Sequence, residues 1–202
     1  MNTKAMNKLS YGLYVLSSRE NGKDNACIVN TVTQVTTSPN RITVAVNKEN
    51  YTAGMISRTG VFNVSLLTET APFSVFQTFG FQSGKTADKF AGYEGETARS
   101  ENGLLYIKDN VNAFISAKVV TETDLGTHIL FLADVTDCEV LGDGESLTYA
   151  GYHKFVKPAA KQEKKKGFRC RICGYIYEGD TLPEDFICPI CKHGAEDFEP
   201  IE

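Results

Sequence analysis

Hydrophobic and polar residues partly alternate along six segments of the chain, and each segment is rich in Val, Ile, Thr, Phe and Tyr. Gly, Asn, Asp or Pro bounds these segments, which is typical of strands joined by short turns. The pattern predicts a mainly β protein, built as an antiparallel barrel or sandwich. The predicted strands are residues 11–18, 26–36, 41–47, 61–67, 112–123 and 127–141.

Two segments interrupt the strand pattern. Residues 50–60 are predicted to form a short helix that ends at the last glycine of the segment. In residues 71–90, Phe73, Phe76 and Phe79 recur at the spacing of one helix face, and a glycine-containing loop follows. We therefore expect two short helices within the β fold.

A change of character near the carboxyl end divides the chain, because apolar alternation gives way there to Lys, Ala, Gln and Pro. We predict a first domain at residues 1–156, a flexible linker at 157–166 and a second domain at 167–202. Taken as about 12 flexible residues, such a linker has an r.m.s. span of roughly 20 Å. Its run of lysines is interpreted as a solvated linker and not as a patch for nucleic acid or anionic membrane.

Composition and charge narrow the class of protein. The 202 residues are 42% hydrophobic and 23% charged, an ordinary makeup for one or two globular domains. The formal net charge of −4 gives no general attraction to nucleic acid. No apolar run approaches the roughly 20 residues of a membrane-spanning helix, and the start of the chain lacks the apolar middle of a signal peptide. We expect a cytoplasmic protein with neither nucleic acid nor membrane as a partner.

Four of the six cysteines form two Cys-x-x-Cys pairs close to the carboxyl end. In a reducing compartment this spacing favours a metal site over disulfides. Two such turns that face each other can complete a tetrahedral site of thiolates, which suits zinc or iron, and the spacing does not choose between the two metals. The predicted ligands are Cys170, Cys173, Cys188 and Cys191.

The residues around these cysteines, "CRICGYIY" and "PEDFICPIC", resemble rubredoxin, in which two such loops hold one iron beside packed aromatic residues. The resemblance covers residues 168–201. Only 14 residues separate Cys173 from Cys188, as in the short rubredoxin-type tails of rubrerythrins, and Phe186 stands where rubredoxins usually carry Trp. The resemblance implies an iron that carries one electron and, with four protein ligands, has no open position for a substrate.

The first domain lacks the G-x-G-x-x-G, P-loop and G-x-S-x-G motifs of dinucleotide folds, nucleotide hydrolases and serine hydrolases. Three of its stretches, at residues 25–56, 81–90 and 124–135, instead resemble in order the flavin reductase-like family of FMN-binding split barrels. The resemblance covers residues 9–154. It implies an FMN-binding split β-barrel that holds the flavin in a groove at the interface of a homodimer.

This resemblance also assigns roles to individual positions. The positions expected around the flavin ring and ribityl chain are Asn30, Thr31, Val32 and Gln34. The positions expected at the phosphate, where a helix start offers free N–H groups, are Asn47, Lys48, Asn50, Tyr51 and Thr52. The positions expected to close over the same site are Ser83, Gly84 and Lys85. The alternative for each is structural, since strand Asn and Thr often only satisfy backbone groups and surface lysines are often only solvated.

One histidine is the candidate catalytic residue. In the family, a histidine in a Gly-Asp-His stretch lies near the nicotinamide pocket, and this chain has Thr127 in place of the acidic residue before His128. The resemblance implies that His128 positions the nicotinamide; the alternative is a strand histidine that only packs or hydrogen-bonds. Of the two remaining cysteines, Cys27 is expected to approach the flavin and Cys138 to lie buried as a small hydrophobic residue.

The two domains together resemble the high-molecular-weight rubredoxins of anaerobes, in which a flavin reductase is fused to rubredoxin. This resemblance implies that NADH or NADPH reduces FMN, that the iron receives electrons singly, and that a flavodiiron protein reducing nitric oxide or oxygen accepts them. Three alternatives stay open. They are a flavin or ferric reductase whose tail serves its own turnover, an electron-transfer module loaded by another protein, and a non-enzymatic FMN-binding barrel with a zinc ribbon.

Overall fold

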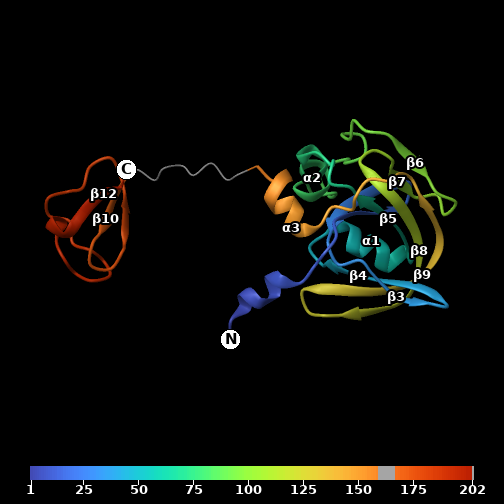
Figure 1. The fold of residues 1–202 in the computed structure, drawn as a ribbon, viewed down its shortest axis with the longest axis horizontal. Helices are drawn as coiled ribbons and strands as arrows, with labels where there is room; N and C mark the ends of the chain where they lie inside the picture. The colour runs from blue at the N-terminus through green and yellow to red at the C-terminus, as the bar shows by residue number, and fades with distance from the viewer. Residues whose placement is uncertain (159–166, 202) are drawn as a thin grey trace. The chain divides into compact units, whose positions relative to one another are not determined.

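The computed structural model of the protein describes residues 1–158 and 167–201. The chain divides into two compact units, Met1–Pro158 and Ala159–Glu202 (Figure 1). Most of the predicted linker, residues 157–166, lies outside the described residues. None of the helices in the described part of the chain has the length and apolar character of a membrane-spanning segment.

The first unit is built on one antiparallel sheet of seven strands (Figure 1). The strands are β1 (Tyr14–Glu20), β2 (Lys23–Val29), β3 (Thr33–Thr37), β4 (Asn40–Asn47), β5 (Val61–Leu67), β8 (Val111–Asp124) and β9 (His128–Val140). Their order across the sheet is β2-β1-β5-β8-β9-β4-β3. Because β1, β4, β5, β8 and β9 each correspond to one predicted segment, the strand pattern of the sequence is confirmed for these five.

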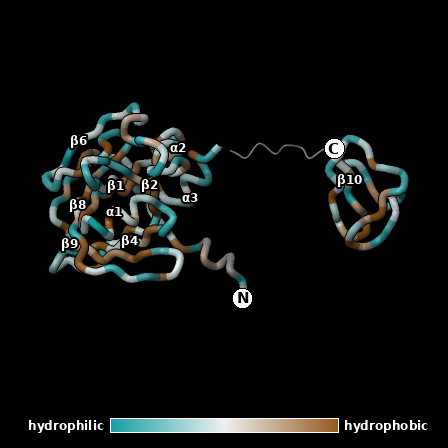
Figure 2. The backbone as a smooth tube through the Cα atoms, turned by 180° about the vertical axis from the view of Figure 1, so that it is seen from behind, coloured by the Kyte–Doolittle hydropathy of each residue, from teal (hydrophilic) through white to brown (hydrophobic). Residues whose placement is uncertain are grey.

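The sheet curls around an apolar core. Strand β2 contacts β4, although the two are not neighbours in the order of the sheet. Six strands send side chains into the enclosed space, and Figure 2 shows hydrophobic residues concentrated along the strands. Buried members of this core include Leu16, Val44, Val64, Ala117 and Phe131. The predicted mainly β barrel is therefore confirmed.

Two helices pack against β2. The first, α1 (Tyr51–Thr59), ends at Gly60, whose left-handed backbone (φ 72°) lets its N–H donate to Ile56 O at 2.8 Å. The second, α2 (Phe73–Gly80), buries Phe79 in a separate apolar cluster on the outer face of the sheet. Both predicted helices are confirmed, including the glycine that ends the first.

The predicted strand at residues 26–36 is wrong in one respect, because it is two strands. Strand β2 ends at Val29, and β3 begins at Thr33 on the opposite edge of the sheet. Between them, the Thr31 hydroxyl donates to Ala45 O at 2.8 Å and accepts from Ala45 N at 3.1 Å. At this point the Thr31 side chain, and not a neighbouring backbone, satisfies the backbone groups of Ala45. The chain can therefore cross from one edge of the sheet to the other without a break in its hydrophobic pattern.

Several short elements were not predicted. They are a 3-10 helix (Thr3–Lys8), a two-stranded sheet of β6 (Thr97–Arg99) and β7 (Leu105–Ile107), and helix α3 (Tyr149–Gly151) with the π-helical turn Tyr152–Val156. The buried Asn63 side chain on β5 anchors the β6–β7 loop, since its Nδ2 donates to Ser100 Oγ at 2.7 Å and to Leu104 O at 3.2 Å. Such contacts join residues far apart in sequence, which a local pattern does not report.

The second unit contains a three-stranded antiparallel sheet in the order β11-β10-β12. Its elements are β10 (Gly167–Cys170), β11 (Ile176–Glu178), the 3-10 helix Ala195–Asp197 and β12 (Phe198–Ile201). The ring of Phe186 forms its centre, with its centroid 4.7 Å from that of Tyr177 and 5.4 Å from that of Phe198. Domains below about 40 residues usually need a metal or disulfides in addition to such a core.

The barrel core provides a stability prediction. Phe131 on β9 is fully buried, so Phe131→Ala is expected to lower the free energy of unfolding by about 3–5 kcal/mol, through lost burial and the cavity left behind. Val140 lies on the same strand with 74% of its surface exposed, and Val140→Ala is expected to change stability by less than about 0.5 kcal/mol. Urea unfolding followed by circular dichroism measures both. Equal effects of the two substitutions would contradict the assigned core.

Candidate flavin pocket and metal centre

The four predicted metal ligands come together in the second unit. Their Sγ atoms all lie within 4.8 Å of one another, and the Cys170–Cys191 and Cys173–Cys188 Sγ pairs are each 3.5 Å apart. Metal–sulfur bonds of about 2.3 Å in a tetrahedron place the sulfurs about 3.8 Å apart. The cysteines therefore fit one tetrahedral ion.

The two Cys-x-x-Cys loops have the same backbone construction. Gly174 and Lys192, each directly after the second cysteine of its loop, have left-handed φ angles of 78° and 63°. This turn lets Gly174 N donate to Cys170 O at 2.9 Å and Lys192 N donate to Cys188 O at 3.0 Å. The repeated geometry holds both thiol pairs on one side of their loops, where a single ion can meet all four.

The surface next to this cluster is apolar at its centre. Cys173 is exposed, and the isoleucines beside the ligands, Ile172, Ile187 and Ile190, are 55%, 62% and 66% exposed. Around them the sequence from residue 167 to 202 carries eight acidic and three basic side chains. An ion at this site would lie close to the surface, behind an apolar patch within an acidic unit.

In the first unit, a pocket of about 220 Å³ lies where the start of α1, the segment after α2 and strand β2 meet. Its lining residues are Cys27, Glu49, Asn50, Tyr51, Thr52, Gly80, Phe81, Gln82, Ser83, Gly84 and Lys89. The structure thus brings together five of the residues that the sequence proposed for the flavin site, from two segments about 30 positions apart. Those five are Asn50, Tyr51, Thr52, Ser83 and Gly84.

Polar contacts from β2 hold the two sides of this pocket. Asn25 Nδ2 donates to Thr52 Oγ1 at 2.8 Å, and Lys23 Nζ donates to Gly84 O at 2.7 Å. Gly84 has to remain small, because a Cβ at this position would lie 2.1 Å from Asn25 Oδ1. Strand β2 therefore sets the distance between the helix start and the loop.

Other predicted phosphate positions do not line the pocket. Lys48 Nζ forms an ion pair with Asp124 at 2.5 Å, and the Asn47 side chain accepts the Glu49 backbone N–H at 2.9 Å. Lys85 is exposed. Lys48 and Asn47 lie at the end of β4, directly before the helix start, so they border the region without entering the pocket.

The predicted ring positions lie along β4. Thr31 is bonded to Ala45, and Val32 packs against the barrel core, but neither lines the pocket. Gln34 lies farther away, where its side chain donates to Asn40 Oδ1 at 2.8 Å near the turn between β3 and β4. Asn30 occupies the bend directly after β2. Asn30, Thr31 and Val32 therefore lie in the crossing between β2 and β3, and Gln34 follows on β3, where it pairs with Ile42 of β4.

His128 begins β9 and is paired across the sheet with Asn47. Its Nδ1 lies 2.9 Å from Thr127 Oγ1. His128 therefore lies beside the end of β4, next to the residues that connect β4 to the start of α1. Cys138, which was expected to be buried, is exposed on the outer part of β9, so that expectation is wrong.

Sequence reasoning missed Lys89 in the pocket wall. This lysine is 4% exposed, and its Nζ donates to Ala26 O at 2.8 Å and to Phe79 O at 2.9 Å. Burial lowers the pKa of Lys89, and burial raises the pKa of the neighbouring Cys27 thiol to about 11. The only available signal was the stretch "ADKF" at the end of a segment already assigned to the site, and no periodicity distinguishes it from a surface lysine.

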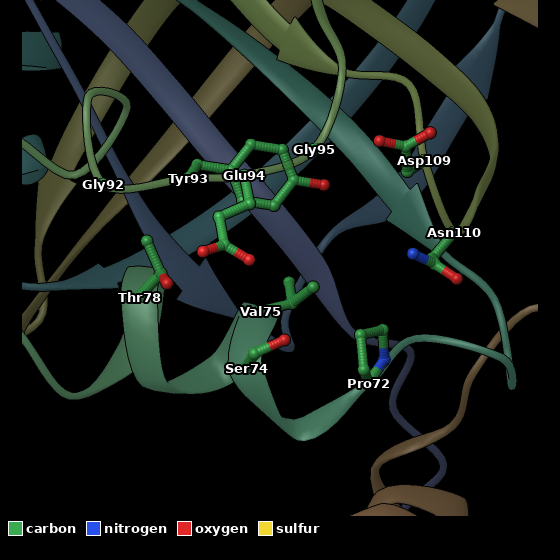
Figure 3. Close-up of a pocket in the computed structure, with 10 residues that line it drawn as sticks. All are labelled: Pro72, Ser74, Val75, Thr78, Gly92, Tyr93, Glu94, Gly95, Asp109 and Asn110. Atoms are coloured by element: carbon green, nitrogen blue, oxygen red, sulfur yellow. The ribbon is translucent and has the colours of Figure 1, made fainter.

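A larger pocket, of about 630 Å³, lies between α2 and the loop before β6. Figure 3 shows its ten lining residues, with the Glu94 carboxylate extending from the loop toward the side where α2 lies. These residues include Glu94 and Asp109 but no basic side chain and none of the predicted flavin positions. Volume favours this pocket, but its charge opposes a phosphate, so the smaller pocket is the better flavin candidate.

Comparison with known families assigns both units. Residues 6–156 match the flavin reductase like domain, and residues 168–199 match the rubrerythrin, rubredoxin-like domain. The high molecular weight rubredoxin of Moorella thermoacetica is 37% identical, with both chains covered in full. This resemblance extends over the two units and the segment between them.

Further relatives match the first unit. The ferric-chelate reductase (NAD(P)H) of Archaeoglobus fulgidus is 42% identical over 78% of this chain and 92% of its own. The FMN-binding protein of Thermus thermophilus shares the fold, with a TM-score of 0.63 at 17% identity over 70% of this chain and 83% of its own. The fold and the four-cysteine site together support a flavin and an iron as cofactors. The chain therefore belongs to the flavin reductase-like family and, through its rubredoxin-like domain, to the high molecular weight rubredoxins.

Proposed function

We propose that the protein passes electrons from NADH or NADPH, through FMN and the four-cysteine iron, to an acceptor protein. Bound FMN would accept an electron pair as hydride and release electrons singly, and the iron would carry one at a time. The observation that carries this proposal is the presence on one chain of a four-cysteine cluster and a separate polar pocket at a helix start. A cluster with four protein ligands has no open position, which leaves hydride chemistry to the pocket.

The helix start supports FMN as the flavin. Asn50, Tyr51 and Thr52 line the pocket, and Asn50 makes no side-chain capping bond to α1. Because the first N–H groups of a helix have no acceptor within it, they are available to a phosphate. Ser83 and Gly84 would border the same group from the other side of the pocket.

The residues between β2 and β3, which lie beside β4, support a position for the flavin ring. Asn30, Thr31 and Val32 would contact the flavin ring and ribityl chain, with a second copy of the chain closing the groove as a homodimer. Nδ1 of His128 is engaged with Thr127, which leaves Nε2 for a ligand at this end of the barrel. We assign His128 to positioning of the nicotinamide.

The surface at the cluster supports delivery to a protein. Ile172, Ile187 and Ile190 would contact an apolar patch on the acceptor, and the acidic side chains of the unit would favour a basic rim around that patch. The acceptor that we propose is a flavodiiron protein in the cytoplasm, which would reduce nitric oxide or oxygen. A second candidate function is reduction of ferric chelates by the first unit alone, which the likeness to the ferric-chelate reductase supports.

The relay predicts a visible spectrum. Purified protein without oxygen is expected to contain FMN and iron in equal amounts, and NADH or NADPH is expected to bleach the flavin and ferric-thiolate bands together. Metal and flavin analysis on the same sample accompanies the titration. A sample holding zinc in place of iron, or a flavin that stays oxidised with both nicotinamides, would overturn the relay.

Two cysteine substitutions distinguish the relay through the iron from reduction of ferric chelates by the first unit alone. Cys170→Ser is expected to lose the iron and its ferric-thiolate absorption while NADH still reduces the flavin, because only the cluster is broken. Cys138→Ser, at an exposed cysteine of the first unit, is the matched control and is expected to keep both signals. Ferric-chelate reduction at an unchanged rate in the Cys170→Ser protein would favour the second candidate function, and unchanged delivery to the flavodiiron acceptor would contradict a relay through the iron.

Nicotinamide positioning is tested at His128. His128→Ala is expected to raise the KM for NADH about tenfold, with smaller effects on kcat and on FMN affinity, because one hydrogen-bonding group is lost. Steady-state kinetics and flavin titration measure these quantities separately. An unchanged KM would return His128 to a structural role beside Thr127.

A further inference from the structure

Lys89 is a buried cation in the wall of the candidate flavin pocket. Its side chain leaves the segment after α2 and reaches the backbone of two other elements, at Ala26 on β2 and at Phe79 in the last turn of α2. Only 4% of the residue is exposed, and the residue still lines the pocket. Lys89 is therefore withdrawn from bulk water but forms part of the pocket wall.

The hydrogen bonds of this ammonium group are incomplete. A lysine ammonium carries three N–H donors, and two of them are used by the carbonyl oxygens of Ala26 and Phe79. One donor is left for an occupant of the pocket. Both carbonyls are fixed in secondary structure, so they also hold the ammonium in place for that occupant.

Within the described residues, the positive charge of Lys89 also has no anionic partner. No carboxylate among the described residues pairs with Lys89, and the adjacent Cys27 thiol is protonated at neutral pH because burial raises its pKa to about 11. Glu49 lines the same pocket but is exposed to water. A buried charge without a counter-charge is unfavourable, and an anion in the pocket would supply one.

The start of α1 adds positive potential to the same pocket. The helix dipole and the free N–H groups at its first turn attract an anion, and Asn50 makes no side-chain capping bond there. Lys23 donates to Gly84 O, Lys48 pairs with Asp124, and Lys85 is exposed and does not line the pocket. Lys89 is thus the buried basic side chain that the described structure places in this pocket.

We propose that Lys89 binds the flavin phosphate and makes the site selective for phosphorylated flavins over riboflavin. The proposal rests on the proposed function, because it takes the pocket to be the flavin site. The phosphate would receive the third N–H of Lys89 and the N–H groups at the start of α1. Riboflavin has no phosphate, so its binding would not use this contact.

The test compares two flavins on two matched variants of the full chain. Flavin-free protein is titrated with FMN and with riboflavin, and quenching of flavin fluorescence gives the two Kd values. Lys89→Met, which keeps the apolar stem, is expected to weaken FMN binding roughly 10- to 100-fold and to change riboflavin binding by less than about threefold. Lys118→Met removes an exposed lysine of β8 outside the pocket and is expected to change neither Kd.

Two results would overturn the inference alone. Equal weakening of FMN and riboflavin by Lys89→Met would make the lysine structural, and unchanged FMN binding would remove it from the site. If the Lys89→Met variant does not fold, Lys89→Arg is used in its place. Lys89→Arg keeps the charge and is expected to retain a preference for FMN over riboflavin. Loss of that preference in folded protein would also contradict the proposal. A wild-type protein that binds neither flavin would overturn the proposed function itself.

Discussion

Burial of apolar side chains from six strands in one core is the interaction on which the rest of the first unit depends. Leu16, Val44 and Phe131 come from different strands and are fully buried in the same cluster, so the sheet has to curl until β2 reaches β4. This closure brings β2, the end of β4 and the start of α1 together. The candidate flavin pocket lies at that meeting point, and its geometry follows from how the barrel closes.

The two candidate centres would bind ligands of opposite charge, and in both the backbone fixes the side chains that would bind the ligand. In the second unit, the left-handed turns at Gly174 and Lys192 fix two thiol pairs, whose negative charge a metal cation would balance. In the first unit, two backbone carbonyls fix the Lys89 ammonium beside a helix start, where an anion would provide the balance. Backbone groups in regular elements are already ordered, so a ligand meets a site that needs little further ordering.

The division of the chain into two units matches a division of chemistry. The cluster has four ligands for one ion and lies close to the surface, which suits exchange of single electrons and excludes a substrate from the metal. The pocket has polar groups from two segments and room for a polar ligand, but none of the described residues there forms a metal site. Neither unit could perform the task proposed for the other.

The sequence by itself determined the features that depend on local spacing. Alternation predicted five of the strands, Gly60 predicted the end of α1, and the two Cys-x-x-Cys pairs predicted the metal ligands, because each of these signals acts within a few residues. Resemblance to a family then named the segments of the flavin site. Only the tertiary structure split residues 26–36 between the two edges of the sheet and exposed Cys138. It also placed Lys89 in the pocket wall, because the burial of this lysine depends on its contact with Ala26, 63 residues away in the chain, as well as on the nearer Phe79.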